Sequence, residues 1–130
     1  MSRALPFLVL SAVLIGCKPT YEDFTKEDSV ALQGYMTGDV YRAKAALLEQ
    51  EKIIAKHEAR GNRGVDFRAT RLVLYGHLFG ICDYMGQTNE ARLYYQKYVE
   101  QLGDKMTYDE LVDRAKKHDD MLKPKWRKEK

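Results

Sequence analysis

Residues 66–86 read DFRATRLVLYGHLFGICDYMG, and their apolar side chains recur at helical spacing around much of the circumference. Such a stretch predicts a helix that is buried on most of its sides. Asp66 can cap the start of this helix, and Gly86 follows its end at Met85. We therefore expect residues 66–85 to form the central helix of an all-α domain.

Four further helices are expected around this one. Apolar residues repeat with the 3.6-residue period after the turn at Gly38, and again before Gly103, which closes the next helix. Thr25 with Asp28, and Thr107 with Glu110, indicate two helix starts. No segment shows the alternation of a strand. The prediction is an all-α fold of five antiparallel helices, at residues 25–36, 40–59, 66–85, 89–102 and 107–123.

The N-terminus has the features of a secretory signal. Arg3 is followed by an apolar stretch from Ala4 to Gly16, which is shorter than the ~20 residues of a membrane-spanning helix. Lys18 and Pro19 end the apolar stretch directly after Cys17. The alternative is that Cys17 is an ordinary residue near the end of a buried helix.

The residues Leu14-Ile15-Gly16-Cys17 resemble the lipobox of bacterial lipoproteins. This resemblance implies cleavage before Cys17, whose sulfur then carries diacylglycerol with acyl chains such as palmitate. It implies a signal peptide at 1–16, a lipidated cysteine and tether at 17–24, a helical domain at 25–123 and a basic tail at 124–130. Lys18 is not the aspartate that retains lipoproteins at the inner membrane of enteric bacteria. In a cell with two membranes, the expected location is therefore the outer membrane, facing the periplasm.

Two segments of the chain look alike. Gly38 precedes Ala43 by five residues and Leu47 by nine, and Gly86 precedes Ala91 and Tyr95 by the same distances. This pattern resembles the middle of a tetratricopeptide repeat, although the two glycines are 48 residues apart (86 minus 38) instead of about 34. The resemblance implies two helical hairpins followed by a C-terminal capping helix. The alternative is a plain helical bundle.

Tetratricopeptide arrays bind peptides or helices on the concave face that the first helix of each hairpin lines. Gly76 and Gly80 lie one turn apart and would leave a strip without side chains, unless they serve only close helix packing. The pattern with which some members clamp a C-terminal carboxylate is missing from the sequence. The resemblance implies a partner-binding face that consists of Leu32, Tyr35, Met36, Val73, Gly76, His77, Gly80, Asp83 and Tyr84.

Other functions find little basis in the sequence. The formal net charge of +3 is too small to indicate nucleic-acid binding. His57, His77 and His118 lie in different expected helices without cysteine or carboxylate at metal-ligand spacing, so we expect no metal, no cofactor and no enzyme. His57 is expected at a solvated helix end. Cys82 is expected to be a small buried hydrophobic residue without a disulfide partner.

The C-terminal tail combines basic residues with the only tryptophan. Such a segment suits an anionic membrane surface, and the alternative is a disordered, solubilising end. The residues expected to contact the membrane are Lys123, Lys125, Trp126, Arg127 and Lys128.

Together these features predict a membrane-anchored helical-repeat scaffold in the bacterial cell envelope. Its expected partner is an envelope protein or peptide, for example of a secretion, pilus or outer-membrane assembly machine, and a second copy of the chain is a further candidate. The alternative from a different class is a structural or lysis-type envelope protein that self-associates without a binding groove.

Overall fold

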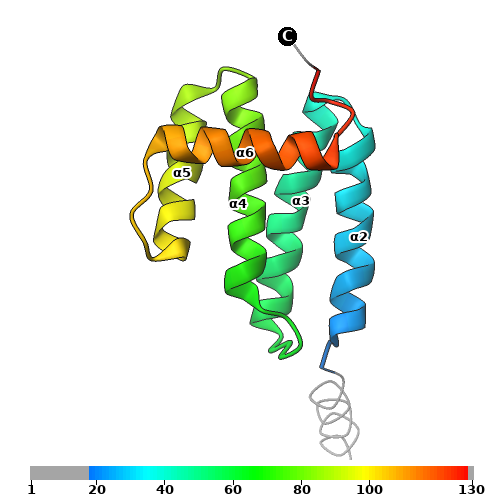
Figure 1. The fold of residues 1–130 in the computed structure, drawn as a ribbon. Coiled ribbons are helices and arrows are strands. Elements are labelled where there is room, and N and C mark those ends of the chain that lie inside the picture. Colours follow the sequence, from blue (N-terminus) through cyan, green and yellow to red (C-terminus); the bar gives the residue numbers. More distant parts are fainter. Residues whose placement is uncertain (1–17, 129–130) are drawn as a thin grey trace, which may run out of the picture.

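The computed structural model describes residues 18–128, which form five α-helices. These are α2 (Tyr21–Thr37), α3 (Val40–Ala59), α4 (Phe67–Tyr84), α5 (Thr88–Leu102) and α6 (Tyr108–Leu122). The predicted all-α fold is confirmed. Helices α2 to α5 stand side by side and alternate in direction, whereas α6 lies across them (Figure 1).

The first helix begins one turn earlier than predicted. Thr20 caps it, because its hydroxyl accepts a hydrogen bond from the Asp23 N–H and the Asp23 carboxylate accepts one from the Thr20 N–H at 2.8 Å. Phe24 in the first turns of the helix is buried. The expected start at Thr25 is therefore wrong, and residues 21–24 belong to α2 instead of to a tether.

The other helix ends follow the sequence closely. Asp66 and Thr107 cap α4 and α6 as predicted, and their side chains accept hydrogen bonds from the N–H groups three residues later. Gly86 and Gly103 have φ angles of 73° and 79°, a left-handed conformation that strains other residues. These caps and glycines explain why the turns fall where the sequence places them.

The helices pair as two hairpins, α2 with α3 and α4 with α5, and α3 packs against α4 between them. Ala43 and Ala91, the alanines of the repeated segment, are fully buried. The pairing in the first hairpin is close, since a Cβ atom on Gly34 would lie 3.1 Å from the Cβ atom of Ala46. Helix α4 contributes much of the core, with Leu78, Phe79 and Ile81 fully buried, as its apolar circumference predicted.

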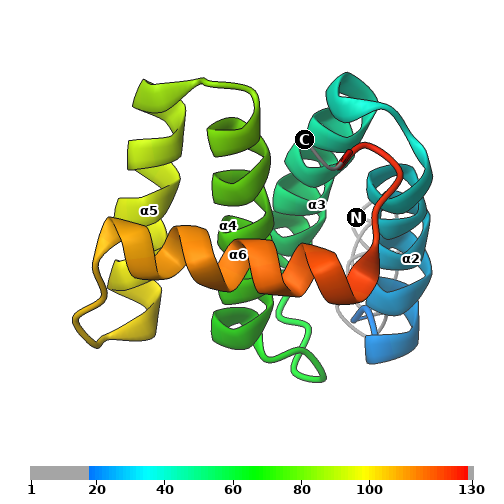
Figure 2. The same ribbon diagram turned by 45° about the horizontal axis from the view of Figure 1, so that its top comes forward.

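Helix α6 departs from the antiparallel arrangement. It starts near α5, crosses α4 and ends near α2, where the tail turns back over the domain (Figure 2). Gly80 lets it approach, because a Cβ atom at that position would lie 3.4 Å from the Cβ atom of Ala115. The last helix thus packs across the face of α4. The described core extends from Phe24 to Trp126, and a chain that begins at residue 17 retains all of it.

Candidate functional site

The face predicted to bind a partner is largely covered by the chain itself. Tyr35 is fully buried, and His77 and Gly80 are also buried. Each predicted residue from α2 or α4, apart from Leu32, Val73 and Gly76, contacts α6 or the tail. The contacts join Tyr35 to Asp119, Met36 to Lys125, His77 to His118, Gly80 to Ala115, Asp83 to Tyr108 and Tyr84 to Trp126. The prediction of one open groove is therefore wrong, because α6 and the tail fill most of it.

A buried carboxylate joins α6 to α2 and to the tail. The Tyr35 hydroxyl donates a hydrogen bond to Asp119 at 3.1 Å, and Arg127 forms an ion pair with the same carboxylate at 3.2 Å. Burial raises the pKa of Asp119 above its usual range, and the contacts with Tyr35 and Arg127 oppose that rise. The two partners therefore satisfy a charge that would otherwise be costly to bury.

The His77 ring connects α4 to α2 and α6. It stacks on Tyr35 at a centroid distance of 4.5 Å and on His118 at 5.0 Å. The His77 Nε2 and His118 Nδ1 atoms lie 3.2 Å apart, as in a hydrogen bond between the two rings. Burial lowers the pKa of His77 to about 4, and His118 adds to this effect. His77 is thus a neutral packing residue near pH 7.

Residues 124–128 of the tail pack onto the domain. Trp126 is 3% exposed and packs edge-on against Tyr84 at 5.2 Å. The Lys125 N–H donates a hydrogen bond to the Met36 carbonyl at the end of α2. Trp126 therefore cannot serve as an exposed membrane anchor in this structure, and the described tail is not disordered. Lys123, which ends α6, and Lys128 remain exposed.

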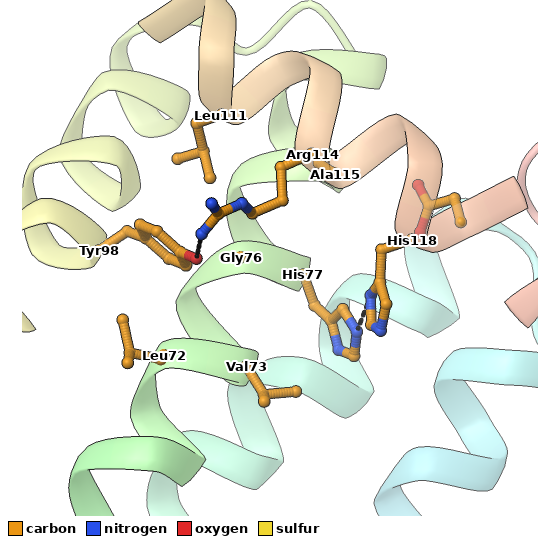
Figure 3. Close-up of a pocket in the computed structure, with 10 residues that line it drawn as sticks. Leu72, Val73, Gly76, His77, Tyr98, Leu111, Arg114, Ala115 and His118 are labelled. Atoms are coloured by element: carbon orange, nitrogen blue, oxygen red, sulfur yellow. Dashed lines mark hydrogen bonds between the residues drawn. The ribbon is translucent and has the colours of Figure 1, made fainter. Parts of the chain in front are cut away.

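One part of the predicted face stays open. Between α4, α5 and α6 lies a pocket of about 200 Å³ (Figure 3), and Val73, at 55% exposed, stands at its edge. Gly76 leaves room in its wall, since a Cβ atom there would have only ordinary contacts with the Tyr98 ring at 3.5 Å. The pocket is lined by Leu72, Val73, Gly76, His77, Tyr98, Leu111, Arg114, Ala115, His118 and Asp119.

The pocket has apolar walls and one arginine, Arg114, at its opening. Leu72, Leu111 and Ala115 supply apolar surface, while the Arg114 guanidinium donates a hydrogen bond to the Tyr98 hydroxyl at 3.0 Å. That bond holds Arg114 along one side of the opening, and His118 lies on another (Figure 3). A pocket of this kind suits an apolar group, and an engineered cavity of about 150 Å³ is large enough for benzene.

The partner-binding face predicted from the sequence includes Val73, Gly76 and His77 of this pocket, all from α4, but none of its residues from α5 or α6. The last helix was expected to cap the second hairpin, and no residue of α5 or α6 was expected at the site. The narrow apolar stripe of α6, with Leu111 and Ala115, was the available signal that this helix packs on another surface. Its direction across α4 cannot be read from that stripe.

The side chains of His57 and Cys82 are buried in the fold. His57 is 1% exposed and contacts Glu27 and Asn62, so its expected position at a solvated helix end is wrong. Cys82 is fully buried as predicted, and burial raises its thiol pKa to about 11. Within residues 18–128, no three His, Cys, Asp or Glu side chains cluster in a way that could hold a metal ion.

The chain shows no significant match to a protein-family model, to a curated protein or to a solved structure. Cys17 and the expected signal peptide lie outside the described residues. None of the described helices has the length and apolar character needed to cross a membrane.

Proposed function

We propose that this chain is a lipid-anchored adaptor of the bacterial cell envelope, which holds a protein partner through the pocket between α4, α5 and α6. The anchor is Cys17, and the expected membrane is the outer one in a cell that has two. Only Lys18, Pro19 and Thr20 separate Cys17 from the first residue of α2. At about 3.5 Å per residue, this link holds the domain within about 14 Å of the anchor.

The open pocket is the observation that carries the adaptor function. Its walls are apolar and Val73 beside it is exposed, although most of the apolar surface around it is covered by α6. We infer that the partner inserts one apolar side chain next to Arg114. An acidic residue of the partner beside that side chain would complement the Arg114 guanidinium.

Photo-crosslinking in cells tests this function. A crosslinking amino acid at Val73 is expected to give a discrete adduct with another envelope protein. The matched control is Val30 on α2, which is 71% exposed and lies outside the pocket. Val73→Asp in the partner complex is expected to weaken binding by at least about tenfold, because it places a charge against an apolar group.

The outcomes separate the adaptor from a self-associating envelope protein. An adduct of twice the chain mass at Val73 would favour self-association. The absence of an adduct at Val73, or equal adducts at Val73 and Val30, would contradict the proposed function.

A further inference from the structure

At the end of the domain where α2 begins, the loop between α3 and α4 is held against the start of α2. The start of α2 and the loop between α3 and α4 lie at this end, opposite the C-terminal tail (Figure 1). The Asn62 side chain donates a hydrogen bond to the Thr20 carbonyl at 2.9 Å and accepts one from the Gly64 N–H at 3.0 Å. Gly64 lies so close to α2 that a Cβ atom there would be 2.8 Å from the Cβ atom of Tyr21. The loop therefore fixes the point at which the chain leaves the domain toward Cys17.

Basic side chains gather around this point. Lys18, Lys26 and Arg60 line a shallow polar hollow of about 420 Å³ together with Asp23 and Glu27, and Arg63 lies in the adjoining loop. All four basic side chains are exposed and make no hydrogen bond or ion pair within residues 18–128. Tyr21, which is 58% exposed, is the first residue of α2 and lies at the same end of the domain. An aromatic ring with lysine and arginine is the composition that favours the headgroup region of a membrane.

The acids near this end are mostly engaged in the fold. Asp23 belongs to the capping box of α2, and Asp66 caps α4. Glu27 contacts both Lys56 and His57. Glu22 and Asp23 are both exposed, and Asp23 lines the same hollow as the basic side chains, where its contacts with Thr20 and the nearby Lys26 lower its pKa. Apart from the paired Glu58 and Arg71, this end carries five cations (Lys18, Lys26, Lys56, Arg60 and Arg63) and four acids (Glu22, Asp23, Glu27 and Asp66), so the basic side chains are in excess by one.

We propose that Lys18, Tyr21, Lys26, Arg60 and Arg63, here called the anchor-side surface, lie on anionic phospholipid headgroups. The inference rests on the proposed anchor at Cys17 and defines how the anchored domain stands. Helix α2 has 17 residues and spans about 25 Å, so Trp126 at its far end points away from the membrane. The basic surface that the sequence suggested for the tail is thus assigned to the opposite end of the domain.

The test uses the chain from residue 17 to residue 130, coupled through Cys17 to a maleimide lipid in vesicles. Cys82 does not compete, because its thiol is fully buried. Energy transfer from Trp126, the sole tryptophan, to a dansyl lipid reports how close the far end comes to the membrane. On phosphatidylcholine vesicles with about one third phosphatidylglycerol, transfer is expected to be low, and it should rise on pure phosphatidylcholine.

Charge-reversed variants sharpen the test. Arg60→Glu with Arg63→Glu is expected to raise the transfer on anionic vesicles to the value seen on neutral ones. The matched control is Lys116→Glu with Lys117→Glu on α6, which changes the same net charge and is expected to leave transfer unchanged. Equal transfer on the two vesicle types, or no effect of reversing Arg60 and Arg63, would overturn the proposal.

A second measurement needs no anchor. Partition of the uncoupled chain into sedimenting anionic vesicles is expected to fall by about tenfold or more in the Arg60 and Arg63 variant, since each basic residue near the surface adds several-fold affinity. An unchanged partition would also contradict the proposal. Because the chain is coupled to both vesicle types chemically, these results do not depend on lipidation of Cys17 in cells. If Cys17 were not lipidated in cells, that finding would refute the proposed function but not the proposed anchor-side surface.

Discussion

Replacing Trp126 with alanine tests whether the tail is part of the fold. The ring is 3% exposed and packs between Tyr35 of α2 and Tyr84 of α4. A tryptophan buries about 200 Å² of side-chain surface, which at about 25 cal/mol per Å² gives an upper value near 5 kcal/mol. Measured truncations of buried aromatic residues cost about 3–5 kcal/mol. We therefore expect Trp126→Ala to lower the free energy of unfolding by about 3–4 kcal/mol.

Urea unfolding of the chain from residue 17, followed by circular dichroism, measures this loss without needing tryptophan fluorescence. In a thermal scan the melting temperature should fall by about 12–16 °C, at about 4 °C per kcal/mol for a domain of this size. Tyr41→Ala is the control, because Tyr41 is 73% exposed and its loss should change the stability by less than about 0.5 kcal/mol. If Trp126→Ala changed stability as little as the control, the tail would not be packed as described.

Two further predictions concern the packing of α6 on α4. Gly80→Val is expected to cost about 1–3 kcal/mol, because a Cβ atom there already lies 3.4 Å from that of Ala115. Gly76→Ala is its control and should be neutral or stabilise by up to about 1 kcal/mol, so equal urea midpoints for the two variants would refute the close approach. Stability should also fall as the pH drops from 6.5 to about 4, because burial lowers the pKa of His77 to about 4 and only the unfolded chain takes up the proton in this range. The expected loss is up to about 3 kcal/mol, and His77→Phe should remove it. Asp119, whose pKa is raised, contributes in the opposite direction in the wild-type chain and in the variant alike. Parallel pH profiles of stability for the two proteins would contradict the assignment to His77.

The sequence was sufficient for the helices because their signals are local. The N-caps Asp66 and Thr107 and the turn glycines Gly86 and Gly103 act within a few residues of their own position. The error at the first helix has the same origin, since the sequence holds two overlapping start signals. The Thr20 and Asp23 box prevails over Thr25 because it brings Phe24 into the core.

The candidate site was only partly predictable because it depends on the direction of one helix. A stripe such as Leu111 and Ala115 shows that α6 buries one side, but it does not identify the surface that receives it. The receiving surface is set by Gly80, by the buried pair of Asp119 and Tyr35, and by the return of the tail to Met36. These contacts join residues that are 35 (115 minus 80), 84 (119 minus 35) and 89 (125 minus 36) positions apart, beyond the reach of periodicity.

The same limitation explains the interpretation of the tail. Five basic residues and one tryptophan in the last eight positions suit a membrane surface by composition alone. The pairing of Arg127 with Asp119 and the burial of Trp126 depend on where α6 ends. The proposed anchor-side surface assigns a similar composition to the opposite end of the domain.

The identity of the mature N-terminus tests the central claim most directly. Mass spectrometry of the protein purified from its own cells should show a chain that begins at Cys17 and carries diacylglycerol on the cysteine sulfur. Residues 1–16 should be missing from the mature protein. An N-terminal peptide that retains Met1 to Gly16, or an unmodified Cys17 in the mature chain, would contradict the lipid anchor and the adaptor function built on it.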